Sequence, residues 1–166
     1  IAIGNQLINA RSETLFEKPA FRSAVKKRRC LIPTDGFFEW KKEGKKKKPY
    51  YIFLKNRHPF GLAGLWESWE RKDEETILSF TIITTEANAL IRPIHERMPA
   101  IVPIENHDSW LDWEQQSPDW IQSLLVSFPA QEMTLHRVDD WVNNPRNDTP
   151  ACIEPISEID EEESFL

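Results

Sequence analysis

The feature that most constrains the fold is a succession of short aromatic and β-branched runs, each bounded by glycine, proline or polar residues. Runs of this length and composition are typical of β-strands. Two of them, 37–40 and 50–54, flank a lysine-rich stretch around Gly44, which predicts a β-hairpin. We interpret 45–48 as its solvated tip rather than a specific site. Further strands are predicted at 30–33, 36–41, 62–66, 77–84, 100–102 and 133–138, with 1–14 as strand or loop.

Helices are predicted between these strands at four places: 19–27, 86–91, 105–113 and 118–125. The fourth has the clearest start, because Ser117 can cap it and Pro118 suits the first helical position. The second is predicted to be capped by Thr85 and to stop before Pro93. A chain of 166 residues with this pattern predicts one α+β domain, dominated by strands in a curved, barrel-like mixed sheet with inserted helices.

The charge is unevenly distributed along the chain. The formal net charge is −6, but positions 154–166 hold six acidic residues and no basic one. Positions 22–48 hold eleven lysines or arginines against three acids, so a local positive region can meet phosphates on a protein that is acidic overall. We therefore predict a domain over 1–157 and an acidic, disordered tail over 158–166.

Composition argues against several classes of protein. No run is long enough to span a membrane, and no segment resembles a signal peptide. The two cysteines, Cys30 and Cys152, have no CxxC spacing, which disfavours a disulfide framework or a zinc site. We expect an intracellular protein (bacterial cytoplasm or nucleoid, or nucleus in a eukaryote), without metal or cofactor.

Glu39 is the first candidate for chemistry. In the run Gly-Phe-Phe-Glu-Trp, strand alternation puts Glu39 on the same face as Phe37, while Phe38 and Trp40 take the other. A carboxylate among aromatic rings is costly unless it is paired or functional, and burial raises its pKa towards the range of proton transfer. Pattern alone leaves an ordinary outward-facing strand residue equally open.

His95 is the second candidate, because Pro93 and Pro99 bracket it in a stiff, non-helical loop. The His-Glu pair does not make a metalloprotease motif, since Pro99 occupies the position of the second histidine. Asn9, in Asn-Ala-Arg-Ser-Glu-Thr, is the third candidate. Cys30 is an alternative nucleophile that could pair with His95, although a small core cysteine is the more common case.

Several stretches together resemble the SOS response-associated peptidase (SRAP) family of abasic-site processing proteins. They occur in the family's order over most of the chain: Asn9-Ala-Arg-Ser-Glu-Thr, Arg29-Cys-Leu-Ile-Pro-Thr-Asp-Gly-Phe-Phe-Glu-Trp, Ala63-Gly-Leu-Trp-Glu, Thr84-Thr-Glu-Ala-Asn, Ile94-His-Glu-Arg-Met-Pro and Val142-Asn-Asn-Pro-Arg-Asn-Asp. The resemblance implies covalent capture of abasic sites in single-stranded DNA. In the family, an N-terminal cysteine condenses with the sugar aldehyde and closes a thiazolidine ring.

The resemblance also implies roles for five residues. Asn9 would orient the reacting N-terminus and the sugar, Glu39 would handle protons and hold the amine, and His95 would act as general acid and base. Arg11 and Arg97 match arginines that would grip phosphates beside the lesion.

The family's Cys-Gly-Arg start, the several dozen residues after it and a Trp-Gly segment before Asn9 are absent from the sequence. As printed, the chain is therefore expected to keep most of the pocket but not the cross-linking reaction. Two other functions remain open. One is a thiol or Glu–His hydrolase, including a peptidase that removes its own N-terminal residue, and the other is a non-catalytic single-strand binder. We expect a monomer.

Overall fold

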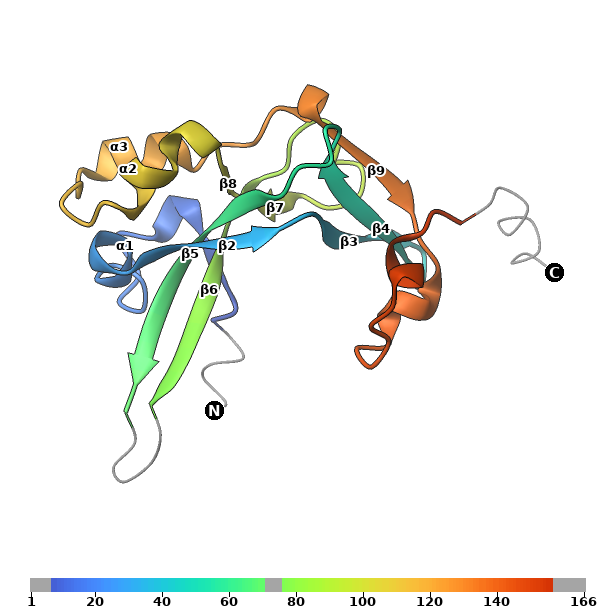
Figure 1. Cartoon of the computed structure of the whole chain (residues 1–166), viewed down its shortest axis with the longest axis horizontal. Coiled ribbons are helices and arrows are strands. Elements are labelled where there is room, and N and C mark those ends of the chain that lie inside the picture. The colour runs from blue at the N-terminus through green and yellow to red at the C-terminus, as the bar shows by residue number, and fades with distance from the viewer. Residues whose placement is uncertain (1–6, 71–75, 157–166) are drawn as a thin grey trace.

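Two β-sheets form the framework of this computed structural model, which describes residues 7–70 and 76–156. The first sheet contains β1 (Asn9–Arg11), β2 (Arg29–Thr34), β5 (Phe60–Trp69), β6 (Ile77–Glu86), β7 (Arg97–Pro99) and β8 (Ile101–Val102). The second contains β3 (Phe37–Glu43), β4 (Lys46–Leu54) and β9 (Met133–Arg137). Figure 1 shows the second sheet at one side of the molecule and α1, α2 and α3 at the other.

The strand order of the first sheet is β1-β6-β5-β2, with β7 paired to β6 and β8 to β5. The β1–β6 pair is parallel and the others are antiparallel, so the sheet is mixed as predicted. The second sheet has the order β3-β4-β9 and is antiparallel. The strand-dominated α+β class is confirmed. The barrel-like closure is wrong, because over the described residues the strands form two separate, open sheets.

Strand alternation divides the buried residues into three layers. In β5, Ala63 and Leu65 face a core shared with the helices, whereas Phe60 and Leu62 face a core between the two sheets. In β4, Ile52 and Leu54 join that central core, and Tyr51 and Phe53 form a third cluster with Val138. Because side chains alternate along a strand, the two faces of β4 and of β5 pack in different cores.

The predicted hairpin is confirmed as β3 and β4. Its register pairs Phe37 with Ile52 and Glu43 with Lys46, around a turn at Gly44 with φ of +61°. Phe37 packs on the central core and Phe38 on the third cluster, so the predicted alternation about Glu39 is correct. Lysines 45–47 are exposed as expected, although Lys46 onward belong to β4 and not to a loop.

The helices are shorter than predicted. The described chain contains α1 (Ala24–Lys27), α2 (His107–Leu111) and α3 (Pro118–Leu124). The start of α3 is as predicted, since the Ser117 side chain accepts a hydrogen bond from the Trp120 amide. The 3₁₀ segments are η2 (Ser12–Thr14), η3 (Ile104–Asn106), η4 (Ala130–Glu132), η5 (Asp140–Asn143) and η6 (Pro150–Ile153). No helix in 7–70 or 76–156 is long and apolar enough to cross a membrane.

The helix predicted at 86–91 is wrong. β6 continues through Glu86, and the buried Asn88 then starts a series of turns that leads to His95. The Asn88 side-chain oxygen accepts from the amides of Leu90 and Ile91, both at 3.1 Å. This local side-chain bonding competes with regular helix formation, and Pro93 disfavours its continuation. The predicted tail at 158–166 and positions 1–6 of the predicted first segment lie outside the described residues.

Candidate active site

Glu39 and His95 come together at the edge of the central core. Glu39 lies in β3, and His95 lies in the loop between β6 and β7. The distance from Glu39 Oε1 to His95 Nδ1 is 3.8 Å, with 22% of the Glu39 side chain and 46% of the His95 side chain exposed. Two groups that can both move protons therefore face each other, half-buried, with access from solvent.

Burial raises the pKa of the Glu39 carboxyl. The charge of His95 and a hydrogen bond from the Trp40 backbone act against this rise, and burial is the larger effect. The expectation that aromatic surroundings would shift this carboxyl towards proton transfer is confirmed in direction. A carboxyl with a raised pKa can give up or accept a proton closer to neutral pH than an exposed glutamate can.

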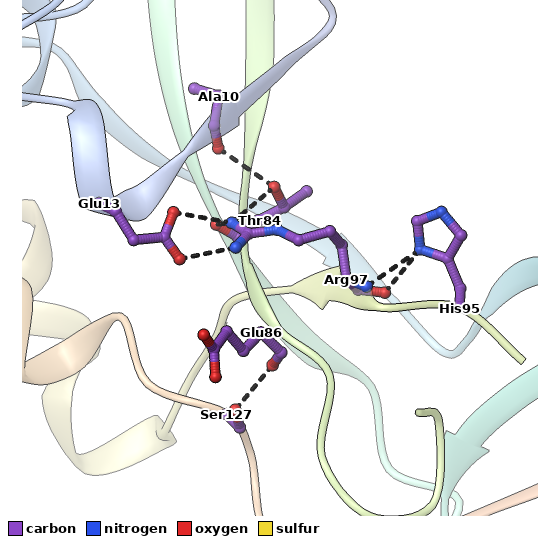
Figure 2. A network of polar contacts seen from close by, with 7 residues as sticks. All are labelled: Ala10, Glu13, Thr84, Glu86, His95, Arg97 and Ser127. Atoms are coloured by element: carbon purple, nitrogen blue, oxygen red, sulfur yellow. Dashed lines mark hydrogen bonds and ion pairs between the residues drawn. The ribbon is translucent and has the colours of Figure 1, made fainter. Parts of the chain in front are cut away.

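The backbone of Arg97 fixes the His95 ring. His95 Nδ1 lies 3.1 Å from the Arg97 amide nitrogen and 3.0 Å from the Arg97 carbonyl oxygen (Figure 2). With Nδ1 deprotonated, the ring accepts from that amide. With Nδ1 protonated, it donates to that carbonyl. Both states of the ring thus find a partner without a large movement, which suits a group that gains and loses protons during a reaction.

The Arg97 side chain extends away from His95 towards η2 (Figure 2). Its two terminal nitrogens donate to the Glu13 carboxylate at 2.6 and 3.1 Å, and Nη2 also donates to the Thr84 carbonyl. These hydrogen bonds lower the pKa of Glu13. Arg97, in β7, therefore links η2 and β6 to the segment that contains His95. Both of its terminal nitrogens already donate to acceptors of the protein.

Asn9 and Arg11 lie on β1, exposed, with the buried Ala10 between them. Within the described residues, neither side chain makes a hydrogen bond or an ion pair, with Glu39 and His95 or with any other group. The parallel pairing of β1 with β6 puts Arg11 opposite Thr84, close to the Arg97 guanidinium. Of the five predicted site residues, the structure joins Glu39 to His95 and His95 to Arg97.

A cavity of about 1000 Å³ opens beside the Glu39–His95 pair. Besides these two residues its wall contains Trp40, Lys42, Lys45, Lys46, Lys47, Ile94, Asp140 and Asn143. Trp40 Nε1 donates to Asn143 Oδ1 at 2.7 Å, which ties η5 to β3.

Sequence reasoning missed these additional wall residues and also Glu13. Trp40, Asn143 and Glu13 lie inside the motifs that carry the family resemblance, so membership of a motif is the signal that could have found them. Asp140 carried no such signal.

Cys30 does not line the cavity that contains Glu39 and His95. It lines a different depression, with Trp66, Leu78 and Phe80, and burial raises the pKa of its thiol. A raised pKa reduces the thiolate fraction that a nucleophile needs. In the described ranges no cluster of three or more His, Cys, Asp or Glu could hold a metal ion.

Comparison with known proteins identifies relatives along nearly the whole chain. The family model described as SOS response associated peptidase (SRAP) matches residues 1–145. "Abasic site processing protein YoqW" of Bacillus subtilis is 44% identical over 153 residues, covering 92% of this chain and 68% of that protein. "Abasic site processing protein HMCES" of Gallus gallus is 34% identical over 169 residues, covering 89% of this chain and 50% of that protein.

Solved structures have the same fold. A crystal structure of a protein from Bacteroides thetaiotaomicron superposes with a TM-score of 0.87 at 37% identity, covering 94% of this chain and 68% of that one. A protein from Bordetella bronchiseptica gives a TM-score of 0.70 at 30% identity, covering 79% of this chain and 64% of that one.

Proposed function

Since this chain belongs to the SOS response associated peptidase (SRAP) family, we propose that it processes abasic sites in single-stranded DNA as part of the response to DNA damage. The observation that carries the proposal is the Glu39–His95 pair, 3.8 Å apart at the wall of an open cavity. We also propose an intracellular, monomeric protein.

The reaction is the one that the family resemblance implies. The α-amine of an N-terminal cysteine attacks the aldehyde carbon of the open abasic sugar, and the aldehyde oxygen leaves as water to give an imine. The thiol then adds to the imine carbon, its proton passes to the nitrogen, and a thiazolidine ring links protein to DNA. The cysteine is not in the printed sequence, which begins at Ile1.

In this reaction Glu39 takes a proton from the attacking amine, and His95 delivers one to the departing oxygen. The raised pKa of Glu39 supports such exchange, because burial makes this carboxyl a better proton acceptor than an exposed glutamate. The two hydrogen-bonding arrangements of His95 with Arg97 support the second role. Reversal of the link uses the same two groups in the opposite sense.

The flanking contacts involve the predicted arginines. Arg11 is exposed and free of partners within the described residues, so it can meet a phosphate directly. Arg97 can do so only if the phosphate displaces the Glu13 carboxylate from its guanidinium. We propose that Asn9, on the same face of β1 as Arg11, orients the reacting terminus.

The test adds a family-type Met-Cys start upstream of Ile1 and incubates the protein with an abasic single-stranded oligonucleotide on a denaturing gel. We expect a heat-stable shifted band. Removing the proton-handling groups in Glu39→Gln or His95→Ala should slow its formation by about 10²-fold or more, the contribution usual for general acid–base catalysis. Cys30→Ser is the matched control and should leave the rate unchanged.

The outcomes separate the three functions. A band that forms equally fast in Glu39→Gln and His95→Ala would remove both residues from the chemistry. Loss of the band in Cys30→Ser alone would favour the thiol hydrolase, which the separate position and raised pKa of Cys30 disfavour. Salt-sensitive binding without any band, from protein shown to be folded, would leave a non-catalytic single-strand binder.

A further inference from the structure

The β3–β4 hairpin carries a row of lysines along the cavity that contains Glu39 and His95. Lys42 from β3, Lys45 from the turn, and Lys46 and Lys47 from β4 all contribute to the cavity wall. The rest of the wall comes from Ile94 and His95 and from Asp140 and Asn143 of η5. The hairpin therefore continues the reacting pocket outward as a positively charged flank.

The charges on this flank are only partly neutralised. Glu43 accepts from Lys41 and Lys48, each at 2.9 Å, and these contacts lower the pKa of Glu43 to about 2. Lys42 and Lys47 face each other as a direct cross-strand pair, and no carboxylate in the described ranges forms an ion pair with either of them. Like charges directly opposite each other on a hairpin are destabilising, so an anion between them would relieve a repulsion that the fold otherwise carries.

The arrangement suits a chain of phosphates better than one small anion. The four lysines are exposed and spread over the hairpin, with Lys42 and Lys47 paired across the two strands, Lys46 on the other face of β4 and Lys45 in the turn. No buried donor converges with them on one point. Flexible lysines act as point charges that follow a polyanion without reading its bases. A protein that recognises a missing base needs such base-independent contacts on the neighbouring nucleotides.

We propose that the β3–β4 hairpin binds the backbone phosphates of single-stranded DNA on one side of the reacting nucleotide, chiefly through Lys42 and Lys47. The inference rests on the proposed function and adds which element of the protein holds the DNA on one side of the reacting nucleotide. The Arg97 guanidinium points away from His95 towards Glu13 of η2 (Figure 2). Glu39, on the other side of the pair, belongs to the hairpin itself. The single-stranded DNA therefore passes over the Glu39–His95 pair. Different elements of the protein hold the nucleotides on the two sides of the reacting one.

The test is the salt dependence of binding to a fluorescent single-stranded oligonucleotide, measured by anisotropy. The variant is Lys42→Gln with Lys47→Gln, and the matched control is Lys18→Gln with Lys55→Gln, two exposed lysines away from the cavity. Each lost phosphate contact should reduce the slope of log affinity against log salt by about 0.7, so we expect about 1.4 for the hairpin variant and almost none for the control. Lys42→Arg with Lys47→Arg should retain the wild-type slope.

Two oligonucleotides, with a stable abasic analogue at the 5′ end or at the 3′ end, test the direction. The hairpin variant should weaken binding of one and leave the other unchanged. An unaltered slope, an equal loss in the control, or equal weakening of both oligonucleotides would overturn the inference. Failure of the proposed function looks different, because the wild type would then bind intact and abasic strands equally while the slopes still report on the hairpin.

Discussion

Glu39 has surroundings that act on its charge in opposite directions. Burial disfavours the carboxylate, whereas His95 and the Trp40 amide favour it, and burial prevails. The pKa in the folded state is therefore higher than the value of about 4.5 for an exposed glutamate. A group of this kind binds more protons in the folded state, so its contribution to stability is complete below the unfolded pKa and is lost as the pH rises through the folded pKa.

The first prediction concerns Glu39→Gln, which is neutral at every pH. Its free energy of unfolding should increase relative to that of the wild type as the pH rises from about 4 to 7.5, because only the wild type acquires a buried charge. Urea unfolding at several pH values measures the difference. Glu43→Gln is the control on the same strand. The lysines lower the pKa of Glu43 to about 2, so its charge is already complete in this window, and its difference from the wild type should change little above about pH 5. A difference independent of pH for Glu39→Gln would contradict the burial argument.

At the scale of elements, the loop between β6 and β7 holds His95 with little regular structure of its own. Asn88 supplies much of its order. Its side-chain oxygen accepts from Leu90 and Ile91, and its side-chain nitrogen donates to the Phe128 carbonyl at 2.8 Å and contacts Met133 Sδ. Asn88 is 8% exposed, so these groups have little access to replacement water.

The second prediction is that Asn88→Ala lowers the free energy of unfolding by about 2–3 kcal/mol, because it leaves buried backbone groups without partners. Asn56 is a matched control, since its side chain makes a similar local bond to the His58 amide at 3.0 Å but is exposed. Asn56→Ala should change stability by less than about 0.5 kcal/mol. Chemical denaturation checks both values, and equal effects would show that burial of Asn88 is not decisive.

For the molecule as a whole, the central core joins the two sheets. Phe60 and Leu62 of β5 pack in it with Ile52 of β4 and Met133 of β9. Neither sheet can separate without exposing this apolar surface, so the layers should unfold together.

The third prediction follows from that shared core. Urea unfolding followed by far-ultraviolet circular dichroism and by tryptophan fluorescence should give coincident curves with one midpoint. Circular dichroism reports on the backbone of both sheets, whereas fluorescence reports on tertiary surroundings on both sides of the central core, since Trp110 lies in the core under the helices and Trp40 lies on β3. Two separated midpoints would show that the sheets unfold independently.

The sequence predicted the local elements better than their arrangement. The hairpin, the strands around Leu62 and Ile77 and the start of α3 follow from short-range pattern and capping. The parallel pairing of β1 with β6 and the division into two sheets do not, since no local signal selects a partner so distant along the chain. The same holds at the site. Glu39 and His95 could be singled out by their neighbours, but Glu13 could not be assigned to Arg97, which is 84 residues away.

The Trp40–Asn143 hydrogen bond joins residues 103 positions apart, and β4 finds its second neighbour only in β9. Bringing together residues so far apart in the sequence costs conformational entropy before the stabilising contacts form, so these pairings slow folding. During synthesis the β3–β4 hairpin forms early from adjacent residues, whereas the part of the cavity wall that contains Asp140 and Asn143 must wait for the C-terminal residues. The proposed phosphate-binding surface is therefore complete before the pocket in which the proposed reaction takes place.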